Sequence, residues 1–247
     1  MSKPLVLFHV SDLHFGYEDH AALDWFADEV SRVKPDWVIC TGDLTMRGTA
    51  REFAAAARWL SALEAPVSLE IGNHDVPYYW YPIARIFRPY KLFRALDESI
   101  GRRPDLPALS LTRLRTVAAF QWRLNLSKGC VAAADLDRAV SDLARNSEMP
   151  LRLVACHHPL SDADTESTGS TRNGKRALAE LARAGADAVL SGHVHDAFDL
   201  TVETENGPIR MIGAGTLSRR LRLTRPSYNR LEWSEATGLL SRAITFG

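Results

Sequence analysis

Short apolar runs alternate with amphipathic segments over the first third of the chain. Three apolar runs have the length of buried strands, at residues 4–10, 37–40 and 66–71. Between them, apolar residues recur at i, i+3, i+4 and i+7 within residues 23–30 and 53–60, the spacing of helices with one buried face. Thr49 followed by Glu52 has the spacing of a capping box at the start of the second helix. This alternation predicts βαβ units with right-handed crossovers.

The pattern breaks once and then continues to the end of the chain. Residues 77–107 are rich in aromatic residues, arginine and proline, and we interpret them as an insertion. Helices are predicted around 136–143 and 178–182, the second ending at Gly185. Further strands are predicted at residues 114–120, 151–156, 187–191, 198–203, 209–213, 229–233 and 239–246. Since there is no internal repeat and no linker, residues 1–247 are predicted to form a single α/β domain, a four-layer α/β/β/α sandwich of two mixed sheets flanked by helices.

Composition excludes several classes of protein. The hydrophobic fraction of 46% and the charged fraction of 24% are those of a globular domain, so a disordered or fibrous chain is excluded. The formal net charge is zero, which argues against an obligatory nucleic-acid partner. No apolar run is long enough to span a membrane. The N-terminus reads as a strand rather than a signal peptide, and three cysteines without a CxxC motif fit a reducing compartment, so we expect a cytoplasmic protein.

Polar residues with metal-binding chemistry follow five of the predicted strands. They are Asp12 and His14, Asp43, Asn73-His74-Asp75, His157 and His158, and His193 and His195. Because loops at the carboxyl ends of strands in an α/β sheet meet at one edge, we expect these side chains to converge there. Glycines precede three of them, Asp43, Asn73 and His193, and would let the backbone turn sharply.

The donor set predicts a metal centre with two ions. Carboxylate oxygen and imidazole nitrogen suit Mn, Fe and Zn, and the absence of thiolates argues against a structural zinc site. There are too many donors for one ion, whereas two ions about 3.5–4 Å apart that share a carboxylate would use most of them. A single histidine at a strand end is usually a satisfied core or surface residue, but five such loops in order are hard to obtain by chance.

These motifs resemble those of the calcineurin-like metallophosphoesterases. The motifs are Asp12-Leu13-His14, Gly42-Asp43, Gly72-Asn73-His74-Asp75, a lone histidine and Gly192-His193-Val194-His195. The resemblance implies that Asp12, His14 and His195 hold one metal, that Asn73, His157 and His193 hold the second, and that Asp43 bridges both. It also implies that His74 stabilises or protonates the leaving alkoxide and that Asp75 orients His74. The family's His-x-Pro pattern selects His157 over His158.

Within the family, the chain is similar to the bacterial class III cyclic-nucleotide phosphodiesterase branch. The segments that carry this similarity are 11–16, 214–216 and Arg219-Arg220. Purple acid phosphatases have a tyrosine three residues after the bridging aspartate, where this chain has Met46. Arg219 and Arg220 are either solvated surface charges or a clamp on the phosphate, since guanidinium groups bind phosphate oxygens bidentately.

The resemblance implies a dinuclear hydrolase of phosphoesters. We expect a phosphodiesterase acting on a small or nucleotide-like diester, with a cyclic nucleotide or a phospholipid among the candidates, by in-line attack of a hydroxide that bridges the two ions. A phosphomonoesterase on the same site is the alternative, and a nuclease or a non-catalytic metal-bound scaffold is less well supported.

The insertion has two interpretations that the sequence leaves open. Its aromatic residues are interleaved with arginine and lysine, and no acid occurs between residues 77 and 96. One interpretation is a helical cap or homodimer surface whose aromatic side chains pack. The other is a lip that stacks a base or makes peripheral contact with a phospholipid headgroup.

Overall fold

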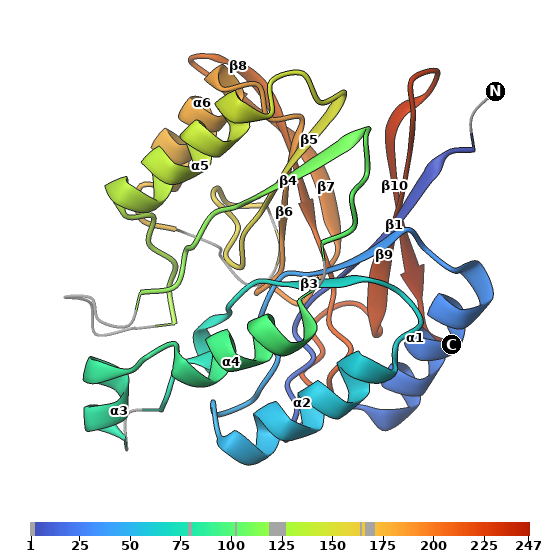
Figure 1. The fold of residues 1–247 in the computed structure, drawn as a ribbon, viewed down its shortest axis with the longest axis vertical. Coiled ribbons are helices and arrows are strands. Elements are labelled where there is room, and N and C mark those ends of the chain that lie inside the picture. Colours follow the sequence, from blue (N-terminus) through green and yellow to red (C-terminus); the bar gives the residue numbers. More distant parts are fainter. Residues whose placement is uncertain (1–2, 79–80, 102, 119–126, 164, 166–170) are drawn as a thin grey trace.

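Two five-stranded sheets lie at the centre of the molecule (Figure 1). The computed structural model describes residues 3–78, 81–101, 103–118, 127–163, 165 and 171–247. The first sheet has the order β10-β9-β1-β2-β3, in which β1, β2 and β3 run parallel and β9 is antiparallel to both of its neighbours. Its strands are β1 (Leu5–Val10), β2 (Trp37–Cys40), β3 (Val67–Leu69), β9 (Ser227–Ser234) and β10 (Gly238–Thr245).

The second sheet has the order β4-β5-β6-β8-β7. Four neighbouring strands run parallel, and β7 at the edge pairs antiparallel with β8, so both sheets are mixed. Its strands are β4 (Leu109–Arg113), β5 (Leu151–Ala155), β6 (Ala188–Ser191), β7 (Phe198–Thr204) and β8 (Gly207–Gly213).

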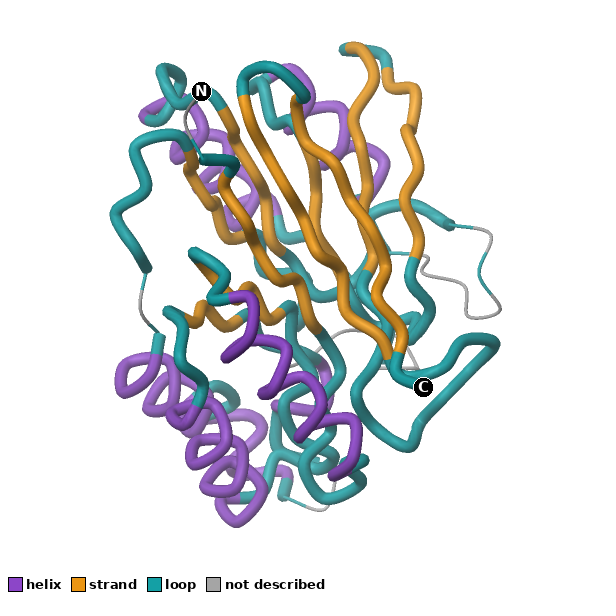
Figure 2. Tube along the Cα trace, turned by 90° about the vertical axis from the view of Figure 1, so that its right-hand side faces the viewer, coloured by secondary structure: helices purple, strands orange, loops and turns teal. Residues whose placement is uncertain are grey.

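Helices cover the outer face of each sheet. Figure 2 shows the two groups of helices on separate sides of the strands. The first sheet carries α1 (His20–Val33), α2 (Ala50–Ala62) and α4 (Lys91–Ile100), and the second carries α5 (Ala133–Arg145) and α6 (Gly174–Arg183). Along β1, Phe8 faces the helices while Leu7 packs against the second sheet, as the two-residue period of a strand requires. The predicted four-layer α/β/β/α sandwich is therefore confirmed.

Local signals at helix ends also match the structure. The Thr49 side chain accepts a hydrogen bond from the backbone N–H of Glu52, and the Glu52 carboxylate accepts one from the backbone N–H of Thr49, which completes the predicted capping box. Gly185, which follows the C-cap residue Ala184 of α6, has φ of +84° and ends that helix. In the described part of the chain, no helix combines the length and apolarity needed to cross a membrane.

The strand predicted at residues 114–120 is wrong. The strand at this place in the sheet is β4, which ends at Arg113; residues 114–118 form a loop, and residues 119 and 120 lie outside the described residues. The alternation of Leu109 and Leu111 with Ser110 and Thr112 is a strand pattern, and the two leucines face the core between the sheets. The strand was predicted at residues 114–120 instead because that run is more apolar.

The insertion divides into two unequal parts. Helix α4 packs on α2 and β3, and its Phe93 and Leu96 are buried in the core under the first sheet. The shorter helix α3 (Pro82–Phe87) precedes it, and its large apolar side chains are exposed. The insertion is thus helical, as one interpretation expected, but α4 is part of the hydrophobic core. Two aromatic residues of the insertion, Tyr79 and Trp80, lie outside the described residues.

Candidate metal centre

The predicted ligands converge between the carboxyl ends of β1, β2, β3, β5 and β6. Asp12, His14 and His195 form one compact group of candidate donors. The Oδ1 atom of Asp12 lies 3.1 Å from Nε2 of His195 and 3.6 Å from Nε2 of His14, and the two Nε2 atoms are 3.2 Å apart. These side chains are buried, so the group is shielded from water. It contains the three residues predicted to hold the first metal.

Backbone carbonyls fix how four imidazoles present their nitrogens. The Nδ1 atoms of His14, His74, His157 and His195 face carbonyl oxygens of residues 45, 46, 41 and 220 at 3.3, 2.7, 2.8 and 2.5 Å, respectively. A carbonyl only accepts, so Nδ1 carries the hydrogen in each ring. In the neutral rings the Nε2 lone pairs then point toward the centre, and an outer partner of this kind is usual for a metal-binding histidine.

The donors of the first group fit a cation. Oδ1 of Asp12 is buried and has no hydrogen-bond donor among the described residues, and the facing Nε2 atoms of neutral His14 and His195 bring two further lone pairs. Three acceptors that meet without a donor repel one another unless a positive charge lies between them. A proton on His195 or a metal ion satisfies this requirement, and oxygen with nitrogen donors suits Mn, Fe or Zn.

Asp43 lies between the two groups of ligands. Its Oδ2 atom is 3.8 Å from Nε2 of His14 and 3.4 Å from Nε2 of His157. Its other oxygen, Oδ1, accepts a hydrogen bond of 2.8 Å from the backbone N–H of His74, which fixes the rotation of the carboxylate. One oxygen of Asp43 is therefore aimed at both groups.

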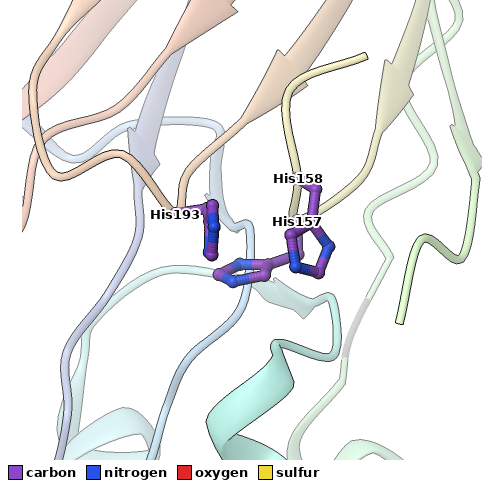
Figure 3. Close-up of side chains that lie close together, drawn as sticks. All are labelled: His157, His158 and His193. Atoms are coloured by element: carbon purple, nitrogen blue, oxygen red, sulfur yellow. The ribbon is translucent and has the colours of Figure 1, made fainter. Parts of the chain in front are cut away.

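The second group is formed around His157. Its Nε2 atom lies 3.2 Å from Oδ1 of Asn73, and its ring centre is 5.2 Å from that of His193. Figure 3 shows the rings of His157, His158 and His193 gathered together, the first two from the loop after β5 and the third from the loop after β6. The structure thus brings the three residues predicted for the second metal to one place.

His158 has its nitrogens occupied elsewhere. Nε2 lies 2.8 Å from the carbonyl oxygen of Ser127 and Nδ1 lies 2.9 Å from Oγ1 of Thr116. These partners use both nitrogens of a neutral ring, and burial together with His193 and His157 lowers the pKa of His158 well below its usual value. Although its ring is near His193, the hydrogen bonds favour His157 as the ligand, in agreement with the His-x-Pro pattern.

The ligand loops are strained. Among the described residues, seven that are not glycine have positive φ, and five of them are predicted ligands: Asp12, His14, Asp43, His193 and His195. Their φ values lie between 45° and 71°, the left-handed region that side chains with a Cβ seldom occupy. Such strain is maintained where the surrounding structure requires one geometry, and it concentrates at functional sites.

The glycines of these loops act in two ways. Gly42 has φ of +104°, as the predicted sharp turn requires. Gly72 has an ordinary φ of −99°, but a Cβ there would lie 2.1 Å from Oδ1 of Asp43. Gly72 is therefore required for the close approach of two ligand loops rather than for its backbone angle.

Asp75 does not orient the ring of His74, contrary to the expectation from the family. Its carboxylate accepts hydrogen bonds from the backbone N–H groups of residues 44, 45 and 72 and from Oγ1 of Thr45. Both ring nitrogens of His74 face other atoms, the carbonyl oxygen of Met46 and Nη1 of Arg220. Asp75 thus joins the second and third ligand loops, while burial and the charge of Asp43 raise its pKa to about 7.

The two predicted substrate-binding arginines differ in position. Nη1 of Arg220 lies 2.9 Å from Nε2 of His74, and the carbonyl of Arg220 holds Nδ1 of His195. Arg219 is exposed, and its backbone N–H binds the carbonyl oxygen of Tyr17. Thr216 donates from Oγ1 to the backbone carbonyl of Asp12 at 2.7 Å, so it supports the first ligand loop.

The pKa values of the histidines at the metal centre are shifted in opposite directions. Burial alone would lower the pKa of His157, but the carboxylate of Asp43 raises it to about 9. In the same way Asp12 overcomes burial and raises the pKa of His195. Burial lowers the pKa of His14 and of His193 to about 3, in spite of the nearby carboxylates. Each of these two carboxylates therefore favours a proton on its imidazole, and a bound metal would compete with that proton.

The sequence identified the side chains of the centre but missed their supports. The orienting atoms are backbone carbonyls, which every residue has, so no residue type marks them. The hydroxyl of Thr116, which binds His158, and that of Thr45, which binds Asp75, are far from these partners in the sequence. The only sequence signal that these side chains converge was the position of each motif directly after a predicted strand.

Comparison with known proteins places the chain in a family. The model of the calcineurin-like phosphoesterase family matches residues 5–197, and the chain belongs to this family. The family consists of hydrolytic enzymes that depend on two metal ions, which agrees with the donor groups described above.

Several individual proteins are similar to the chain. A probable cyclic nucleotide phosphodiesterase of Synechococcus sp. is 24% identical over 208 residues, which are 78% of this chain and 74% of that protein. A glycerophosphodiester phosphodiesterase of Enterobacter lignolyticus is 35% identical over 82 residues, which are 29% of this chain and 30% of that protein. A dimetal phosphatase of Danio rerio has the same fold, with a TM-score of 0.66, 13% identity and coverage of 99% of this chain and 100% of that one.

Proposed function

We propose that this protein is a phosphodiesterase that hydrolyses a small or nucleotide-like diester with the help of two metal ions. The observation that carries the dinuclear part is the position of Asp43, whose Oδ2 atom lies within 3.8 Å of Nε2 of both His14 and His157. The diester part is supported by the two relatives described as phosphodiesterases.

The donor groups suggest how the ions would be held. Asp12, His14 and His195 would hold one ion, Asn73, His157 and His193 would hold the other, and Asp43 would be shared. When bound, two such ions supply Lewis acidity at the phosphoryl oxygens and lower the pKa of water.

His74 and Arg220 are arranged for the leaving group and the phosphate. Nδ1–H of His74 donates to Met46, so Nε2 accepts from Arg220, whose guanidinium can only donate. Phosphate oxygens would compete for this guanidinium and release Nε2 of His74. That nitrogen could then accept a proton from solvent water and pass it to the leaving alkoxide, which departs as the alcohol.

The test is the hydrolysis of bis(p-nitrophenyl) phosphate beside p-nitrophenyl phosphate. Metal-stripped protein with added Mn²⁺ should hydrolyse the diester faster than the monoester, and Asp43→Asn should reduce turnover by about 100-fold or more, since a shared ligand is lost. A preference for the monoester would replace the proposal with a phosphomonoesterase. Two bound metals without turnover of any phosphoester, including cyclic nucleotides and glycerophosphodiesters, would contradict an enzymatic role.

A further inference from the structure

Helix α3 presents an apolar surface to solvent. Ile83, Ile86 and Phe87 occupy positions i, i+3 and i+4 of the helix and are 75%, 64% and 76% exposed. Tyr81, directly before the helix, is 59% exposed. Leaving four large apolar side chains in water on one short segment is unfavourable, and such clusters mark interaction surfaces.

A hydrogen bond from α3 and the packing of α4 leave this apolar surface facing solvent. Arg85, on the same helix, donates from Nη1 to the carbonyl oxygen of Pro77 at 2.7 Å, so its charge is directed back to the chain that leaves the metal centre. After α3, the buried Phe93 and Leu96 fix α4 to the core. Helix α3 is therefore linked to Pro77 through Arg85 and continues into the anchored α4, while its apolar side chains are exposed to a partner.

Positive charge surrounds the same segment. The chain contains four cationic residues and no acid between Asp75 and Asp97, although its overall net charge is zero. Arg88, Lys91 and Arg94 are exposed, and together with Phe87 they line a hollow of about 710 Å³. The hollow is also lined by Pro89, Tyr90, Ala95 and one acid, Glu98. Apolar side chains beside exposed cations are typical of segments that lie in the interface of an anionic membrane.

We propose that α3, with the cations that follow it, docks the protein on the surface of an anionic lipid bilayer. The apolar residues Ile83, Ile86 and Phe87 would enter the headgroup region, and Arg88, Lys91 and Arg94 would bind lipid phosphates. A second copy of the chain fits less well, because a two-fold contact centred on α3 would bring like charges together. A nucleic acid fits less well because two of the three exposed apolar side chains of α3 are isoleucines, which offer no stacking surface.

The docking segment follows the third ligand loop closely in the sequence. Helix α3 begins at Pro82, seven residues after Asp75 in the third ligand loop. This inference does not depend on the proposed activity, since membrane binding is measured without turnover.

The test is co-sedimentation of the full chain with vesicles. Vesicles of phosphatidylcholine with 30% phosphatidylglycerol should bind the protein, whereas pure phosphatidylcholine should bind it at least about 10-fold more weakly. The double variant Ile83→Glu/Phe87→Glu and the double variant Arg88→Glu/Lys91→Glu should each lower the partition coefficient by about 10-fold or more. Both should keep the melting temperature of the parent, because these side chains are exposed.

Leu240→Glu is the matched control. Leu240 is 51% exposed but lies on the edge strand β10, so this variant should bind vesicles like the parent. Binding that is absent, independent of anionic lipid, or equally reduced by the control would overturn the proposal. So would a dimer in sedimentation velocity without lipid that the α3 variants abolish, since the surface would then belong to a second copy.

Discussion

Backbone carbonyls determine the tautomer and orientation of the imidazole rings at the metal centre. Each of the rings of His14, His157 and His195 gives its Nδ1 hydrogen to a backbone carbonyl and keeps Nε2 for the interior. The residue types could be read from the sequence because a metal centre needs oxygen and nitrogen donors. The tautomers could not, because they depend on carbonyls that folding brings into place.

Arg220 and Arg219 provide a test at the scale of single residues. Arg220→Ala should lower kcat/KM for the diester by about 10- to 100-fold, because the guanidinium beside His74 that we propose to bind phosphate is lost. Arg219→Ala should change it by about 2-fold or less, since that side chain is exposed. Metal content should be unchanged in both variants, because residue 220 holds His195 through its backbone carbonyl. Equal effects of the two substitutions, measured by steady-state kinetics, would contradict the role of Arg220.

Elements with a strong periodic pattern were predictable, and those that depend on tertiary contacts were not. The capping box of α2 and the apolar runs of β1, β2 and β5 are local signals. Strand β4 was misplaced because the run that follows it is more apolar, although residues 114–118 form a loop and the pairing with β5 ends near Leu114, which a single sequence does not show. The burial of α4 likewise depends on its packing against α2 and β3.

One ion-pair cluster ties three of these elements together. Arg113, at the end of β4, binds Glu70 after β3 and Asp97 of α4, each at 2.7 Å. Its guanidinium also donates to the carbonyl of Leu69. The cluster therefore links the edge strands of both sheets to the insertion, through residues that are distant in the sequence.

Loss of this link should destabilise the fold. Arg113→Ala should lower the free energy of unfolding by about 2–3 kcal/mol, because the buried carboxylate of Glu70 loses its partner. Adding Glu70→Gln should recover part of that loss. Arg145→Ala, which breaks an exposed ion pair with Asp142, is the control and should cost less than about 0.5 kcal/mol. Urea unfolding measures all three. An equal loss for Arg113→Ala and the control would show that the cluster contributes no more to the free energy of unfolding than an exposed ion pair.

At the scale of the whole molecule, two sheets from different parts of the chain meet to complete the centre. The first sheet carries the loops with Asp12, Asp43 and Asn73, and the second carries those with His157 and His193. Neither sheet alone supplies a full set of the candidate ligands, so each group is complete only where the two sheets meet. The sequence predicted that the loops converge, since each motif follows its own strand, but it expected them at the edge of one sheet, whereas the structure divides them between two.

The most direct test of this account is the stoichiometry of metal binding. Calorimetric titration of Mn²⁺ into the metal-stripped protein should reach saturation at two ions per chain, and Asp43→Asn should weaken at least one of them by about 10- to 100-fold. A single site per chain, or two sites unaffected by Asp43→Asn, would contradict the shared position of Asp43 between the two groups of ligands.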